Sequence, residues 1–231
     1  MCSSDLLLFI RHIRRRVGAG TGLVDPVLFV NRGFSIGLGM SLCFQATTAG
    51  LLFILTLTLQ YGLGCTPLET ALVHVPYALG ASVAIGGVAR RALPRMGLRL
   101  PLMGVGVMLS GLLALAALIW GQGGLVPLGL ALLLTGTGMG LIGGPTGPIT
   151  LSDVELVHAG SASGTLKAVQ QLGAASGAAL IGGTYFALAQ GLTADAARNA
   201  FLTTMPLLVL LLLLVGFLIT RLPRDLRLFK K

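Results

Sequence analysis

Residues 201–220 read FLTTMPLLVLLLLLVGFLIT, twenty consecutive residues without a charged side chain. A helix rises about 1.5 Å per residue, so about 20 apolar residues are long enough to cross the hydrocarbon core of a bilayer. Between Pro206 and Ile219 no side chain can form a hydrogen bond. The sequence therefore predicts a membrane-spanning helix whose surface suits lipid.

Similar apolar stretches fill most of the chain before this one. They run over residues 34–61, 70–89, 100–120, 125–151 and 161–190. The whole chain of 231 residues is 55% hydrophobic and only 10% charged, with a mean hydropathy of +0.92, whereas soluble domains carry about 25% charged residues. We therefore expect an all-α membrane protein with six transmembrane helices.

The basic residues test this helix count independently. If both termini are cytoplasmic, 15 of the 16 Lys and Arg residues fall on the inner side and Arg198 alone falls outside. This asymmetry is what the positive-inside rule predicts for six spans. It indicates a multi-pass protein of the cell (cytoplasmic) membrane, and it disfavours nucleic acid as a partner because the basic clusters sit between apolar runs. The expected organisation is a cytoplasmic segment 1–33, a bundle 34–221 and a basic tail 222–231, with a cytoplasmic basic loop of Arg90, Arg91, Arg95 and Arg99.

Polar residues in the first predicted helix recur on one side. Gly37, Ser41, Gln45 and Thr48 are spaced by four, four and three residues, which places them on one face of a helix. That face should look into protein or water. Two interpretations stay open, since these groups can line a cavity or can simply bond to a neighbouring helix.

Small residues follow a different pattern in the fourth and fifth predicted helices. They recur every fourth residue at Gly136, Gly140 and Gly144, at Gly160 and Gly164, and at Gly173 and Gly177. Such stripes let helix backbones approach closely, which matters because lipid provides no hydrophobic drive for helix association. Pro145 and Pro148 interrupt the fourth predicted helix, and we expect them to permit a kink.

Few residues suggest catalytic or metal chemistry. The three cysteines are too far apart for a CxxC site and are interpreted as free thiols. Asp153, Glu155 and His158 lack a fourth metal ligand, so a solvated loop is the expectation. His74 and Tyr77 lie near the outer end of the second predicted helix, where an interhelical or surface role competes with a coupling role. We expect no enzyme activity, no metal and no cofactor.

Several of these segments together resemble a known family. The run 136–145, the segment 159–164 and the sequence Gln170-Gln171-Leu172-Gly173 with Gly177 are similar to the twelfth and thirteenth helices of fourteen-helix drug:proton antiporters of the major facilitator superfamily. The leader 26–34 and the basic loop 95–99 resemble the segments that precede its ninth helix and follow its tenth. Lys167 and Gln170 depart from the family pattern, which usually has a small polar residue and an Arg there.

The resemblance implies a fold and a function. The six helices would form two three-helix inverted repeats, the C-terminal half of a secondary multidrug exporter that works by alternating access against an N-terminal half missing from this chain. Its partners would be the bilayer, an amphipathic drug-like substrate and protons, with the coupling carboxylates in the missing half. The implied substrate cavity contains Ser41, Gln45, Thr48 and Thr137. The implied helix-packing and inter-bundle seam contains Gly136, Gly140, Gly144, Pro145, Gly160, Gly164, Gln170, Gln171, Gly173 and Gly177.

Two alternatives remain open. A transporter of another major facilitator subfamily, for a sugar or a metabolite, would share the fold and most of the glycine stripes. A stand-alone six-helix protein that homodimerises through its glycine faces would show the same hydropathy pattern.

Overall fold

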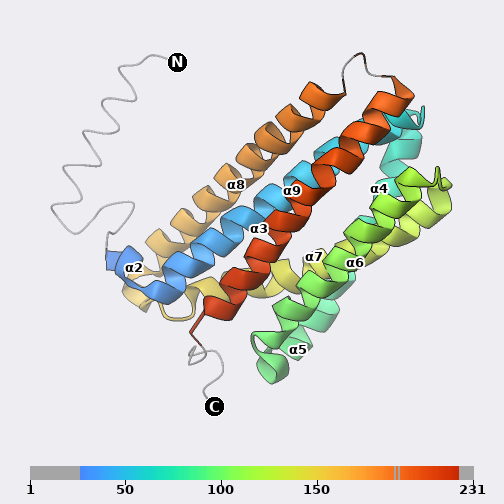
Figure 1. The fold of residues 1–231 in the computed structure, drawn as a ribbon. Coiled ribbons are helices and arrows are strands. Elements are labelled where there is room, and N and C mark those ends of the chain that lie inside the picture. Colours follow the sequence, from blue (N-terminus) through green and yellow to red (C-terminus); the bar gives the residue numbers. More distant parts are fainter. Residues whose placement is uncertain (1–26, 190, 192, 224–231) are drawn as a thin grey trace, which may run out of the picture.

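The regular elements that the structure describes are all helices (Figure 1). The computed structural model describes residues 27–189, 191 and 193–223, so the predicted tail and most of the predicted N-terminal segment lie outside the described residues. The elements in chain order are α2 (Val27–Val30), α3 (Arg32–Leu57), the π-helical η1 (Thr58–Gly62), α4 (Pro67–Val83), the π-helical η2 (Ala84–Ala89), α5 (Arg90–Met96), α6 (Arg99–Trp120), α7 (Leu125–Leu151), the 3₁₀ turn η3 (Leu156–His158), α8 (Ala159–Leu188) and α9 (Ala194–Arg221).

Capping side chains determine where several helices begin. The Thr66 hydroxyl accepts a hydrogen bond from the Glu69 amide, and the Glu69 carboxylate accepts one from the Thr66 amide in return, which is a capping box. Asn31 caps α3 through the amides of Gly33 and Phe34. Because caps are polar, hydropathy alone places these starts two or three residues too late.

Within the described ranges, five helical segments are long and apolar enough to cross a membrane. They are Arg32–Gly62, Pro67–Met96, Arg99–Trp120, Leu125–Leu151 and Ala194–Arg221. The prediction of an all-α membrane protein is confirmed at this level. The predicted fifth helix forms as α8, but α8 is not among the five, since it consists largely of Gly, Ala, Ser and Thr and carries Lys167.

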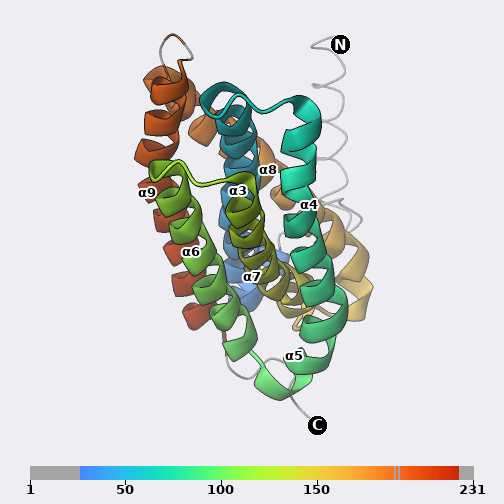
Figure 2. The same cartoon turned by 90° about the vertical axis from the view of Figure 1, so that its right-hand side faces the viewer.

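The six long helices are interleaved rather than packed in chain order. The helix α3 packs between α8 and α9, whereas α7 packs between α4 and α6; Figures 1 and 2 show these two groups side by side. Contacts of α6 with α9 and of α3 with α7 join the groups. The buried core includes Leu51, Met108, Leu132 and Phe201, which are fully buried.

Basic residues gather at one end of the bundle. Figure 1 shows the start of α3, the segment α5, the start of α8 and the end of α9 at the same end. Arg32, Arg221 and the predicted basic loop belong to these segments, whereas Arg198 lies near the start of α9 at the opposite end. We call the end that carries Arg32, Arg221 and the predicted basic loop the basic end.

Glycines form the closest contacts between helices. A Cβ on Gly136 or Gly140 of α7 would overlap the backbone of Tyr77 or Ala81 in α4. A Cβ on Gly173 or Gly177 of α8 would likewise overlap the backbone of α3. These contacts join the same helix pairs that dominate the packing, so backbone approach sets the spacing within each group.

The prolines of α7 do not end the helix. The helix is continuous from Leu125 to Leu151 and includes Pro145 and Pro148. The predicted span 125–151 therefore forms as one helix that contains both prolines, and the kink stays a prediction. In the same segment, the hydroxyls of Thr146 and Thr150 each donate a hydrogen bond to the carbonyl oxygen four residues earlier.

Two glycines of α7 provide a matched test of the packing. Gly136→Ala should lower the free energy of unfolding by about 1 to 3 kcal/mol, the usual cost of overpacking, because the methyl group would overlap the Tyr77 carbonyl. Gly147→Ala should be close to neutral or stabilising, since nothing lies within 4 Å of its Cβ position. Thermal unfolding of the detergent-purified variants measures both. Equal losses would contradict the contact.

Candidate functional site

Three buried polar atoms cluster on α3 and α4 without hydrogen-bond partners among the described residues. They are Thr48 Oγ1, His74 Nε2 and Tyr77 Oη. Thr48 and Tyr77 are 8% and 7% exposed, and their side chains interact across the two helices although no hydrogen bond of good geometry joins the hydroxyls. His74 and Tyr77 are one helical turn apart, which places them on one side of α4. We call these three residues the polar cluster.

The remaining bonds of His74 limit what its free nitrogen can do. The ring atom Nδ1 lies 2.7 Å from the Thr70 carbonyl oxygen. A carbonyl can only accept, so Nδ1 carries the hydrogen and a neutral ring presents Nε2 as an acceptor. Unpartnered buried polar atoms are uncommon in folded proteins and cost free energy. The polar cluster is thus a place where a ligand that can both donate and accept would gain bonds.

The predicted cavity residues of α3 differ in what they offer such a ligand. Ser41 is fully buried, and its hydroxyl donates to the Gly37 carbonyl at 2.8 Å. Gln45 is half-buried and makes no hydrogen bond with any described residue, and it lies one turn from Thr48. The side chains of Gln45 and Thr48 are therefore available, whereas the Ser41 hydroxyl is already used by its own helix.

Thr137 of α7 lies against Gly80 of α4, one turn from Tyr77. Its hydroxyl donates to the Leu133 carbonyl at 2.8 Å. No hydrogen bond among the described residues joins it to the α3 side chains. The Thr137 hydroxyl, like that of Ser41, is therefore already used by its own helix.

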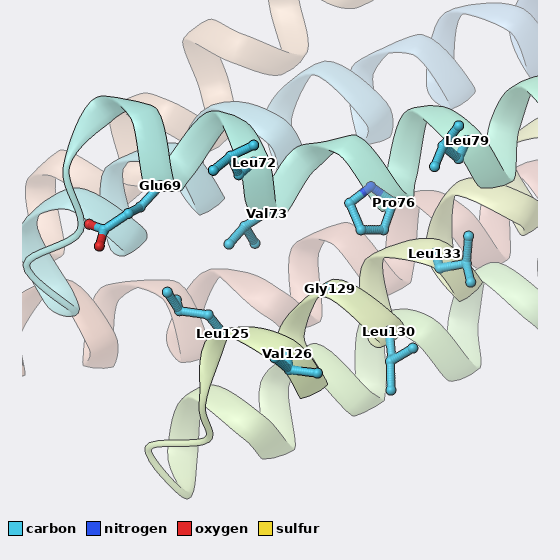
Figure 3. A pocket seen from close by; sticks show the side chains of 10 residues that line it. All are labelled: Glu69, Leu72, Val73, Pro76, Leu79, Leu125, Val126, Gly129, Leu130 and Leu133. Carbon is cyan, nitrogen blue, oxygen red and sulfur yellow. The ribbon is translucent and has the colours of Figure 1, made fainter.

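A second candidate site is a groove between the ends of α4 and α7 away from the basic end. It is lined by Leu72, Val73, Pro76 and Leu79 of α4 and by Leu125, Val126, Gly129, Leu130 and Leu133 of α7, with Glu69 at one end (Figure 3). The groove has a volume of 530 Å³ and is almost entirely apolar. Its one carboxylate is already bound by the Thr66 amide and hydroxyl, at 2.8 and 2.9 Å. We call it the α4–α7 groove.

The residues expected at the inter-bundle seam separate into two sets. The first set packs helices inside this chain and consists of Gly136, Gly140, Gly173 and Gly177. Gly144 belongs to it as well, since a Cβ at this position would lie 3.0 Å from the Ala89 methyl group. Pro145 is buried with them. Gly160 and Gly164 instead face open space, since nothing lies within 4 Å of their Cβ positions. No described residue packs against them, and their expected place in the inter-bundle seam stays a prediction.

The polar seam residues of α8 follow the second set. Gln171 is exposed and Gln170 is half-buried. Gly183, further along α8, also has nothing within 4 Å of its Cβ position. One side of α8 thus packs on α3, and the other is exposed and carries small and polar residues together with large apolar ones such as Leu172 and Leu180.

Sequence reasoning noted some of these features and missed others. His74 and Tyr77 were noticed but were not placed in the cavity; their three-residue spacing in an apolar helix was the available signal. The α4–α7 groove was missed, because it arises where Gly129 of α7 meets Pro76 of α4 across two helices. Nothing in either local sequence indicates that match.

Two curated proteins show what the chain is similar to. A "Probable actinorhodin transporter" of Streptomyces coelicolor is 33% identical over 192 residues, which are 79% of this chain and 32% of that protein. A "Putative multidrug resistance protein MdtD" of Salmonella paratyphi B is 27% identical over 228 residues, 96% of this chain and 47% of that protein. No protein-family model matches the chain.

These alignments also bear on the expected extent of the chain. The chain spans between a third and a half of the length of these relatives, and it aligns with their C-terminal portion. Because the relatives are transporters, the expectation that this is not an enzyme is confirmed.

Two tyrosines allow the unpartnered hydroxyl to be tested. Tyr77→Phe should leave the free energy of unfolding unchanged or raise it by up to about 1 kcal/mol, because it removes a buried hydroxyl that makes no hydrogen bond of good geometry, even with the neighbouring Thr48. Tyr185→Phe should lower it by about 1 kcal/mol, since Tyr185 Oη accepts a hydrogen bond from Thr58 at 3.2 Å. Chemical unfolding in mixed micelles compares the two. A loss for Tyr77→Phe as large as that for Tyr185→Phe would show that the Tyr77 hydroxyl is bonded.

Cysteine labelling tests which end faces outward. Cys65 lies in the loop between η1 and α4, away from the basic end, and is half-buried. An impermeant maleimide should modify Cys65 in intact cells but not Cys43, which lies within α3. Burial, and then the nearby Glu69 carboxylate, raise the pKa of the Cys65 thiol above its ordinary value of 9.0, so the rate should still increase with pH above 9.0. A Cys65→Ser control identifies the labelled site, and labelling only after permeabilisation would reverse the orientation.

Proposed function

The chain belongs to the major facilitator superfamily of membrane transporters, and we propose that it forms the C-terminal six-helix bundle of a fourteen-helix multidrug exporter. The substrates would be amphipathic small molecules, and the exporter would be driven by protons and work by alternating access. In this proposal α8 also spans the membrane, as the fifth of six helices, and both termini of the bundle are cytoplasmic.

The observation that carries the proposal is the polar cluster. Thr48, His74 and Tyr77 place three polar atoms without hydrogen bonds inside a helix bundle whose other buried hydroxyls, such as those of Ser41 and Thr47, bond to their own helices, and Gln45 adds a free amide one turn from Thr48. A ligand pocket is typically apolar with a few placed polar groups that determine orientation. The geometry therefore supports a site for a mostly apolar molecule that carries one or two hydrogen-bonding groups.

The interleaved packing supports the proposed inverted repeats. If the repeats are α3 to α6 and α7 to α9, the first helix of each packs against the second and third helices of the other. The glycine contacts repeat in the same way, with α7 against α4 and α8 against α3. Pseudo-symmetry of this kind is typical of secondary transporters, whose halves rock around a site near the bilayer midplane.

The exposed side of α8 supports an interface with a second bundle. Gly160, Gly164 and Gly183 leave the backbone uncovered, and small residues of this kind suit close approach of another helix. We assign this surface, with Gln170 and Gln171, to the inter-bundle seam. The packing glycines Gly136, Gly140, Gly173 and Gly177 would then hold this bundle together instead.

Proton coupling rests on the partner bundle in this proposal. The acidic residues in the described ranges are Glu69, Asp153, Glu155 and Asp195, and each lies in a loop or in the first turn of a helix. Intramembrane carboxylates are the usual groups of a proton relay. This bundle would therefore supply substrate contacts and the rocking surface, and the coupling carboxylates would belong to the other half.

Two neighbouring threonines of α3 test the substrate site. In the full-length transporter, Thr48→Val should change the transport of hydrogen-bonding substrates by about five-fold relative to purely apolar ones, the effect of one lost bond of about 1 kcal/mol. Thr47→Val is the matched control, because the Thr47 hydroxyl is buried and donates to the Cys43 carbonyl at 2.8 Å. Its effect should be equal for all substrates.

A substrate panel in inside-out vesicles, normalised to the protein in the membrane, measures this difference. Gln45→Ala should behave like Thr48→Val. A uniform loss of all substrates by Thr48→Val and Gln45→Ala would place both residues outside the substrate site and would sink the proposed site.

A further inference from the structure

A second groove lies near the basic end of the helical segment Pro67–Met96, which consists of α4, η2 and α5. We call this segment the rod. The groove follows α4 into η2 and α5, has a volume of 460 Å³, and is lined by Val83, Gly87, Val88, Arg91, Ala92, Arg95 and Met96. Most of its lining is apolar, and the two arginines lie toward one end. We call it the basic groove.

The local helix geometry explains why the groove is open. The six residues Ala84–Ala89 form a π-helical segment between two α-helices, a distortion that is common at functional sites. Gly86 and Gly87 fall in this segment, and nothing lies within 4 Å of their Cβ positions. Val83 and Val88 beside them are 65% and 45% exposed. The rod thus presents a hollow apolar surface that no part of the described chain covers.

The charges at the end of this surface are unpaired. Arg91 and Arg95 are four residues apart and both are exposed, so their side chains project from one side of α5. Neither forms an ion pair or a hydrogen bond with a described residue. No carboxylate lines the groove. Two free guanidinium groups therefore stand next to a strip of exposed valine and glycine.

This combination matches one kind of partner. A guanidinium group binds phosphate with paired hydrogen bonds and is weakly hydrated, and basic pockets at the cytoplasmic side of helices attract anionic lipid headgroups. Val83 lies eight residues before Arg91, about 12 Å along the helix at 1.5 Å per residue. That length accommodates the upper part of an acyl chain below its phosphate.

We propose that the basic groove binds a phospholipid with an anionic headgroup, with its acyl chain along Val83, Gly87 and Val88 and its phosphate between Arg91 and Arg95. The inference rests on the membrane placement under the proposed function, and it concerns a different surface from the substrate site. The α4–α7 groove offers no such selectivity, because its Glu69 carboxylate is already bound by Thr66.

Lipid binding is tested in the full protein that carries this chain. Native mass spectrometry of the protein released from nanodiscs counts retained lipids, with phosphatidylglycerol as the anionic probe and phosphatidylcholine as the neutral one. The unaltered protein should retain phosphatidylglycerol preferentially. The double variant Arg91→Gln/Arg95→Gln should bind it about 30-fold more weakly, since each of the two arginines would lose a direct hydrogen bond to the phosphate worth about a five-fold factor.

Two further variants separate the groove from general surface charge. Arg90→Gln/Arg99→Gln removes the same charge from the same end but from outside the groove lining, and should leave retention within about two-fold of the unaltered protein. Gly87→Leu keeps all charges and fills the groove, and should abolish the preference. Because the Gly87 Cβ position has no neighbour within 4 Å, this variant should keep the unaltered melting temperature.

Three outcomes would overturn the proposal. The first is equal retention of both lipids, the second is an equal effect of the two double arginine variants, and the third is unchanged preference in Gly87→Leu. A cysteine at Met96 that crosslinks to another segment of the protein instead of to lipid would also overturn it. None of these readouts involves transport, so a failed substrate panel and a failed lipid measurement are distinguishable.

Discussion

The backbone contact between Gly136 of α7 and Tyr77 of α4 is the constraint on which the rest of the bundle depends. Lipid offers helices no hydrophobic drive to associate, so they must gain dispersion energy from close approach. Gly140 against Ala81 extends the contact, and Gly173 and Gly177 make its counterpart between α8 and α3. Because Tyr77 both receives Gly136 and carries an unpartnered hydroxyl, the packing of α7 on α4 determines where the polar cluster sits.

The helix α4 shows how one rod can serve several purposes. Its Gly80 and Ala81 side packs on α7, and Tyr77 reaches toward Thr48 of α3. Its remaining surface is open and apolar, and it continues through η2 into the two arginines of the basic groove. These three surfaces need different residue types, and a mean hydropathy over the helix reports none of them. The helical segment Pro67–Met96 is therefore central to the proposed function although most of its apolar stretch is exposed.

Sequence reasoning located the helices well, because hydropathy and charge asymmetry act over whole segments. The predicted span 125–151 coincides with α7, and the predicted 100–120 differs from α6 by one residue. It could not assign individual glycines: Gly164 and Gly173 look alike in a stripe, yet one faces open space and the other meets Leu42 of α3. It also could not foresee the pairing of Thr48 with Tyr77, since no local pattern specifies which helices become neighbours. Site residues therefore depended on tertiary contacts to a degree that the helices did not.

The weak hydropathy of α8 follows from its two-sided packing. Small residues contribute little hydropathy, but they are what close contact with α3 requires on one side, and Gly160, Gly164 and Gly183 extend the same composition to the open side. Lys167 lies eight residues into α8, about 12 Å along the helix, within reach of the surface for a flexible stem. Gln171 lies about 18 Å along, near the middle of a hydrocarbon core about 30 Å thick. An exposed amide at that depth costs several kcal/mol in lipid. The proposed partner bundle would remove this cost by covering the open side of α8. The small and polar residues that lower the hydropathy of α8 are therefore also the residues that a rocking interface between two bundles requires.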